Sequence, residues 1–361
     1  MIPEKSRISQ GQLMFFILQS QVGVGILSLP NKMQAGAKGG GWISVLIAGF
    51  AVQVIILILC ALCKRFPSDT IYHFLPKITG NLIGNLLCIG YISYFLLTAG
   101  TILAKFADVV SRWVLQETPR WTLLLLAVLT CMYLLKENVR VIARLFVITT
   151  STIIVMVILS LIGYVKMNLS YIFPITEVGW GKILLAANDA LYPLIGYEVI
   201  LVIYPFVKGK SGGKLKATSL GNMLSTLFYT FEVFTSLIIF SPAVMPAISE
   251  PLLYMLKGFS FQIINRIDLI FLSLWVFIVC TSMVSWTFMA TVGLARFFHR
   301  DEHKKAVPYS LFIIFILAMM AQESSISDFF DQMVKFAHYT FVIGIPLILL
   351  CLTYLTRKRW T

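Results

Sequence analysis

Ten apolar stretches, separated by short charged loops, follow one another along the chain. They lie near residues 12–36, 40–63, 82–110, 121–136, 142–165, 183–207, 217–240, 267–295, 306–322 and 332–355. About 20 apolar residues are enough for an α-helix to cross a bilayer. The pattern predicts an all-α polytopic membrane protein, one transmembrane domain over residues 1–361 with about ten transmembrane helices, of which the fourth and ninth are short.

Two of the ten spans contain helix-breaking residues. The first holds Gly23, Gly25 and Pro30, and the sixth holds Pro193 and Gly196. In hydrocarbon a broken helix exposes backbone N–H and C=O groups, which costs about several kcal/mol each unless protein, water or a ligand pairs with them. We therefore predict that Gly23 to Gly25 is the unwound midpoint of a discontinuous helix beside a binding site. The alternative is that Pro and Gly only kink these helices, because both are common in membrane helices.

The positions of the two breaks predict the internal organisation of the domain. Breaks in the first and sixth of ten helices are typical of two five-helix halves with opposite topology. The halves would cover residues 1–165 and 183–355. Their sequences show no identity, so this inverted repeat rests on the placement of the breaks.

Composition and charge agree with a membrane protein and predict its orientation. Hydrophobic residues make up 58% of the 361 residues and charged residues 12%, and the mean hydropathy is +0.87, which excludes an ordinary soluble domain. If the chain begins in the cytoplasm, 19 of the 29 Lys and Arg residues lie in cytoplasmic segments and 9 in outer ones, with Lys105 inside a span. The positive-inside rule then places both termini in the cytoplasm.

The net charge of +13 is scattered over loop ends. A nucleic-acid-binding protein would gather such charge on one surface with interleaved aromatic residues, so no nucleic-acid partner is expected. The basic run Lys208 to Lys216 (KGKSGGKLK) lacks the spacing of a phosphate-binding loop. We expect it to contact anionic membrane lipid or a cytoplasmic partner.

The segments around the two breaks resemble a known family. Gly23 to Pro30 (GVGILSLP) is similar to the glycine-rich first-helix signature of the amino acid–polyamine–organocation transporter superfamily. Together with Tyr192 to Glu198 (YPLIGYE) and ten spans in 361 residues, this signature gives a closer resemblance, to the GerAB/GerKB-type spore permeases. These are the B subunits of bacterial spore germinant receptors. The resemblance implies a LeuT-like fold in the inner membrane of a spore, A and C receptor subunits as partners, and recognition of a small germinant such as an amino acid.

The chemistry of the two breaks suits a zwitterion. A half-helix that begins near Gly25 points free N–H groups and the positive end of its dipole at the midplane, which suits a carboxylate. Carbonyl groups freed around Ala190 to Pro193, with Glu198 nearby, suit an ammonium group or a proton. The predicted ligand contacts are Val22, Gly23, Val24, Gly25, Tyr94, Thr98, Thr101, Tyr192, Pro193, Gly196, Glu198 and Thr287.

Polar residues inside other spans add further candidates. Tyr91, Tyr94, Thr98, Thr101, Lys105 and Asp108 recur at three- and four-residue spacing in the third span, so they share one helix face, which should line the bundle interior or a wet cavity. We expect Lys105 and Asp108 to pair with each other. Helix packing explains the Ser and Thr residues around Thr287 better than ligand contact does, and it leaves open whether they form a sodium site. The candidate proton carriers are Glu198, Glu232 and Asp189.

No catalytic, cofactor-binding or metal-binding constellation emerges, so the chain is not expected to be an enzyme. His299 to His303 (HRDEH) matches a zinc-protease pattern, but a catalytic zinc needs a third ligand and a shaped cavity, so a solvated loop is the better interpretation. Three functions remain. We favour a sensing subunit in which a bound germinant shifts helix packing; the alternatives are a proton-coupled amino acid permease and a conduit for water or ions.

Overall fold

The computed structural model describes residues 4–259, 265–298 and 303–355, and these residues are predominantly helical. The α-helices are α1 (Gln10–Gln21), α2 (Gly25–Ala37), α3 (Gly41–Arg65), α4 (Ile71–Thr79), α5 (Asn81–Trp113), α6 (Arg120–Leu135), α7 (Val139–Leu161), α8 (Gly179–Leu191), α9 (Ile200–Ile203), α10 (Ser211–Ile239), α11 (Pro251–Lys257), α12 (Ile267–Phe297), α13 (Val307–Met320), α14 (Ser324–His338) and α15 (Ile345–Leu355). A π-helical segment, Tyr339–Gly344, joins the last two. Within the described ranges there is no β-strand.

Each of the ten predicted spans contains a helix or a broken pair of helices. By length and composition, six helices in the described part of the chain qualify as membrane spans, or seven if the bent pair Gly179–Leu194 and Tyr197–Phe206 counts as one. The short apolar helices α6 and α13 occupy the fourth and ninth spans, as predicted. Gly25–Arg65 counts as one stretch by this criterion, but it turns at Lys38–Gly40 and so contributes to both the first and the second span. The helix α1 completes the first span, which brings the total to ten.

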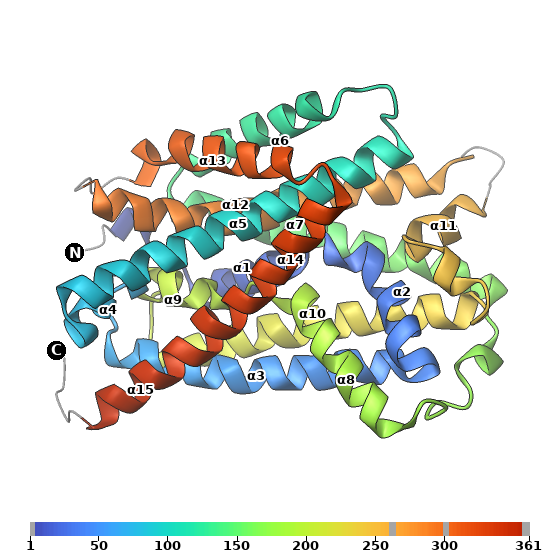
Figure 1. Cartoon of the computed structure of the whole chain (residues 1–361), viewed down its shortest axis with the longest axis horizontal. Helices are drawn as coiled ribbons and strands as arrows, with labels where there is room; N and C mark the ends of the chain where they lie inside the picture. Colours follow the sequence, from blue (N-terminus) through green and yellow to red (C-terminus); the bar gives the residue numbers. More distant parts are fainter. Residues whose placement is uncertain (1–3, 260–264, 299–302, 356–361) are drawn as a thin grey trace.

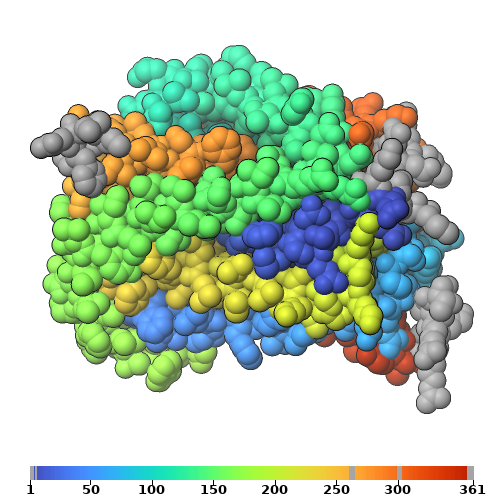
Figure 2. Space-filling model, turned by 180° about the vertical axis from the view of Figure 1, so that it is seen from behind, coloured from blue at the N-terminus to red at the C-terminus, as the bar shows by residue number. Residues whose placement is uncertain are grey.

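The helices form one bundle with both chain ends at the same side (Figure 1). The short helix α1 lies in its interior, in contact with α7, α10 and α12. From behind, the start of α1 fills the space between α7 and α10 (Figure 2). The helix α5 packs on α12 and α13, and the α14–α15 pair crosses the bundle obliquely (Figure 1). The first half of the broken first span, α1, is therefore flanked by the continuous helices α7, α10 and α12.

The outer face of the bundle is apolar. Large hydrophobic side chains project outward along the long helices, among them Phe50 (73% exposed), Leu86 (69%) and Ile148 (67%). Exposure of this kind is unfavourable in water but suits lipid tails. Polar side chains such as Gln19, Gln21 and Asn222 are instead buried in the interior. The chain is therefore an integral membrane protein with polar side chains in its interior.

Candidate binding site

The first span is broken at the predicted glycines. The helix α1 ends at Gln21 because Val22 turns extended, with φ −81° and ψ 119°. The helix α2 restarts at Gly25, and no side chain caps its first N–H groups. Pro30, in contrast, lies inside α2 without ending it. The sequence correctly predicted both the break and the start of the second half-helix.

The sixth span is broken by Pro193 and Gly196. The helix α8 gives way to a 3-10 turn at Tyr192–Leu194, Ile195 is extended, and the chain resumes through a second 3-10 turn at Tyr197–Val199. Gly196 has φ +128°, a left-handed conformation that side-chain-bearing residues rarely adopt. The two halves of the span are bent by 49°.

Glycine also lets the two breaks pack directly against each other. A Cβ atom on Gly25 would lie 2.8 Å from Cβ of Pro193. A Cβ atom on Gly196 would lie 2.4 Å from the carbonyl oxygen of Ser20. Neither distance is compatible with a side chain, so these two glycines set how closely the first and sixth spans approach.

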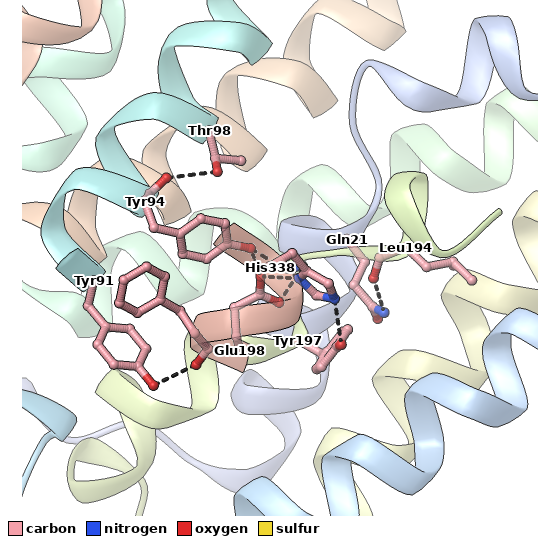
Figure 3. Close-up of polar contacts among 10 residues, drawn as sticks. Gln21, Tyr91, Tyr94, Thr98, Leu194, Tyr197, Glu198 and His338 are labelled. Atoms are coloured by element: carbon pink, nitrogen blue, oxygen red, sulfur yellow. Dashed lines mark hydrogen bonds and ion pairs between the residues drawn. The ribbon is translucent and has the colours of Figure 1, made fainter. Parts of the chain in front are cut away.

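Side chains from neighbouring helices take up part of the exposed backbone. The Tyr229 hydroxyl, from α10, accepts a hydrogen bond from the N–H of Gly23 (3.4 Å) and donates one to the carbonyl of Gln21 (3.1 Å). Gln21 Nε2 donates to the carbonyl of Leu194 (2.8 Å; Figure 3) and to Oδ1 of Asn222 (3.0 Å). Gln21 Oε1 is buried without a hydrogen-bond partner among the described residues.

A cavity of about 50 Å³, counted as space for the centres of water molecules, lies between the two breaks. It is lined by Ser20, Gln21, Gly23, Val24, Gly25, Ser28, Lys32, Thr98, Thr101, Ile102, Lys105, Tyr192, Pro193, Ile195, Tyr229, Ser282 and Trp286. Seven of the predicted contact residues are among them: Gly23, Val24, Gly25, Thr98, Thr101, Tyr192 and Pro193.

The other five predicted contacts lie off the cavity wall. They are Val22, Tyr94, Gly196, Glu198 and Thr287. Thr287 is fully buried and donates its hydroxyl to the carbonyl of Met283 in its own helix (2.8 Å), as in ordinary helix packing. Val22 and Gly196 belong to the breaks themselves, but their surroundings are filled by protein. Sequence reasoning missed Gln21 and Tyr229, whose side chains form hydrogen bonds with backbone groups at the two breaks.

Glu198 lies in a closed polar cluster with Tyr94, Tyr197 and His338 (Figure 3). Its carboxylate accepts hydrogen bonds from the Tyr94 hydroxyl (2.6 Å) and from the backbone N–H of Gly196 (2.8 Å). His338 Nδ1 lies 3.6 Å from Glu198 Oε1, and His338 Nε2 contacts the Tyr197 hydroxyl at 3.1 Å. The cluster ties α5, the sixth span and α14 together.

His338 was not singled out from the sequence. Its signal was its position inside the last apolar span, where an ionisable residue marks a functional site by default. In the structure it is 4% exposed, at the point where α14 passes into the π-helical segment. Local π-helical turns are frequent at functional sites.

Lys105, which lines the cavity, is ion-paired, and the expectation about its partner was wrong. Lys105 does not pair with Asp108 but with Asp331 of α14, at 2.6 Å. Asp108 instead pairs with Arg120 at the start of α6. Spacing along one helix could not reveal these partners, since each lies on a different helix.

The two remaining proton-carrier candidates lie apart from the cavity wall. Asp189 of α8 is largely exposed and lies 3.5 Å from Lys335. Glu232 of α10 is fully buried, and both of its carboxylate oxygens are within 3.0 Å of the Ser160 hydroxyl. Ser160 is thus the hydrogen-bond partner of Glu232.

The structure offers no metal-binding cluster within its described ranges. Four residues of the zinc-protease lookalike, His299 to Glu302, lie outside those ranges. His303 is described, and its Nε2 contacts the carbonyls of Leu135 and Glu137.

Comparison with known proteins gives a consistent family and fold. The family described as "Spore germination protein" matches residues 7–327. Spore germination protein GerQB of Bacillus cereus is 26% identical over 88% of this chain and 87% of its own length. Spore germination protein YndE of Bacillus subtilis (strain 168) is 23% identical over 99% of each chain.

Among solved structures, the transporter MhsT in complex with L-phenylalanine superposes with a TM-score of 0.71, at 14% identity over 95% of this chain and 88% of that one. A Na⁺-coupled sialic acid symporter superposes with a TM-score of 0.70, at 11% identity over 94% and 78%. These likenesses confirm the predicted LeuT-like fold.

Proposed function

Since this chain belongs to the spore germination protein family, whose members are not enzymes, we propose that it recognises a small germinant, an amino acid, in the cavity between its two broken helices. The proposal includes the inner membrane of a spore as its location, cytoplasmic termini, and A and C receptor subunits as partners. The germination role follows from family membership; the ligand and its binding residues are inferred from the cavity.

The observation that carries this proposal is that two kinds of polar group at the same cavity, hydrogen-bond donors and an acceptor, lack side-chain partners among the described residues. The start of α2 brings N–H groups without a side-chain cap, which favour a carboxylate. Gln21 Oε1 is a buried acceptor without a partner, which favours a donor such as an ammonium group. An α-amino acid carries both complementary groups two bonds apart.

A second candidate is a proton-coupled amino acid permease. The observation that favours it is the Glu198–His338 contact, because Glu198 lies only three residues beyond the cavity residue Ile195 and has a second ionisable group, His338 of α14, beside it. The two candidates share the same ligand site, since one fold can transport or only sense.

Binding is tested by thermal stability of the detergent-purified chain against a panel of amino acids. A ligand that binds only the folded state stabilises it by RT ln(1 + [L]/Kd). We expect one or more amino acids to stabilise the wild type but not Gly25→Ala, whose new methyl group would stand against Pro193 at the cavity. Gly36→Ala is the matched control: it crowds Ala186 of α8 at 3.1 Å but does not line the cavity, so it should keep the response.

Equal loss of response in both glycine variants would show that general disturbance of the α2–α8 contact, not the cavity, is responsible. Absence of any response in the wild type and in the assembled receptor would refute the binding proposal. If binding is found, counterflow of labelled amino acid in vesicles identifies a permease, and binding without flux identifies a sensor.

A further inference from the structure

The cavity between the breaks is lined by basic residues but by no acidic ones. Lys32 of α2 and Lys105 of α5 line it, and no Asp or Glu is among its lining residues. A ligand that enters this space therefore meets positive charge from side chains as well as from the start of α2.

Four other charged side chains act electrostatically on Lys32: Lys105, Asp331, Lys335 and Asp189. They form two ion pairs. Lys105 holds both carboxylate oxygens of Asp331, at 2.7 and 2.6 Å, and Lys335 lies 3.5 Å from Asp189. Lys32 has no hydrogen bond or ion pair with any described residue. Asp331 and Asp189 are thus each paired with another lysine, and the ammonium group of the exposed Lys32 is left as a positive charge at the cavity without an ion-pair partner in the described part of the chain.

Lys32 lies on the cavity face of α2. Gly25, Ser28 and Lys32 follow at intervals of three and four residues, so they share one face, and all three line the cavity. Seven residues of helix separate the Cα atoms of Gly25 and Lys32 by about 10 Å. Helical side chains lean toward the N-terminus, so the long lysine side chain shortens this separation by roughly half. The ammonium group and the start of α2 then present two anion-binding points a few ångströms apart.

We propose that the cavity selects a ligand with two anionic groups, namely an amino acid with a carboxylate side chain. The inference rests on the proposed function and narrows its substrate class. The α-carboxylate binds at the start of α2, the α-ammonium group donates to Gln21 Oε1, and the side-chain carboxylate pairs with Lys32. The ligand thereby supplies the partner that Lys32 lacks.

The test compares isosteric ligands that differ in charge. Dissociation constants of aspartate against asparagine, and of glutamate against glutamine, are measured by isothermal titration on the full-length wild type. At least one acidic ligand should bind tenfold or more tightly than its amide. Lys32→Met should reduce that ratio to about one, and Lys32→Arg should retain most of it. The matched control is Lys335→Met, which removes the same charge from an ion pair off the cavity wall and should leave the ratio within about twofold.

The outcomes separate this inference from the proposed function. Binding of neutral amino acids that Gly25→Ala abolishes, with no preference for the acidic partner, supports the cavity as the site and overturns the charge selection. An acidic preference that Lys335→Met removes as fully as Lys32→Met overturns the contact with Lys32, because long-range attraction then explains it. Absence of any amino acid binding to the assembled receptor refutes the proposed function itself.

Discussion

The hydroxyl of Tyr229 is predicted to hold the break in the first span together. It is the atom that both accepts from Gly23 N–H and donates to the Gln21 carbonyl, and the ring that carries it is fully buried. Tyr229→Phe keeps the ring and removes this single oxygen. Two backbone groups at the unwound segment would then lose their side-chain partner.

The cost follows from the geometry of the two bonds. A buried backbone group left without a partner destabilises the fold by about 1–3 kcal/mol. The bond to the Gln21 carbonyl, at 3.1 Å, is well formed, whereas that from Gly23 is long at 3.4 Å and contributes less. Because Tyr229 also lines the cavity, water can reach part of the vacated space. We therefore expect Tyr229→Phe to lower the free energy of unfolding by about 2 kcal/mol.

The measurement is reversible unfolding by SDS in mixed micelles, with Tyr204→Phe as the matched control. Tyr204 is equally buried, at 1% exposed, but its hydroxyl has no hydrogen-bond partner within the described ranges. Removing that hydroxyl should leave stability unchanged or raise it slightly. Equal effects of the two substitutions would refute the reasoning, because the loss would then reflect removal of any buried hydroxyl and not support of the break.

Five further substitutions, in three sets, test other parts of the structure by the same unfolding measurement. Gly196→Ala should prevent stable folding or cost more than about 3 kcal/mol, since it adds left-handed strain to a clash of Cβ with backbone; accumulation of normally stable protein would contradict this. Glu198→Gln and His338→Ala should each destabilise, and a double-mutant cycle should show a coupling of about 1 kcal/mol or more, whereas additive losses would mean that the pair does not interact. Ser160→Ala should cost about 1–3 kcal/mol by leaving Glu232 without its donor, and adding Glu232→Met should recover most of that loss.

The overall fold could be predicted because it depends on local patterns. Apolar length predicts a span, and Gly or Pro in a span predicts a break, whatever the rest of the chain does. Gly23 to Gly25 and Pro193 to Gly196 are broken in the structure where these rules place the breaks. The division into repeats at residues 1–165 and 183–355 is a prediction that remains to be tested.

The partners of individual polar residues could not be predicted, since they are chosen in three dimensions. Lys105 and Asp108 share a helix face, and spacing alone favours their pairing. The bundle instead brings Asp331 to Lys105 and Arg120 to Asp108, so both charges are neutralised by residues of other helices. The same limit explains why His338 was missed: its distance from Glu198 along the sequence gives no hint of their contact.

The direct contact between the two breaks has a consequence for how a ligand acts. The Gln21 side chain of the first span donates a hydrogen bond to the Leu194 carbonyl of the sixth, and Gly25 packs closely against Pro193. A movement of either broken span therefore disturbs the other. A ligand shifts a conformational equilibrium only as far as its affinities for the two states differ. A ligand that satisfies Gln21 Oε1 and the start of α2 together binds only while both breaks keep this arrangement, and it thereby stabilises the state in which the first and sixth spans are packed as seen here. Both sensing and transport require such a coupling, and what distinguishes them is whether the other end of the cavity subsequently opens.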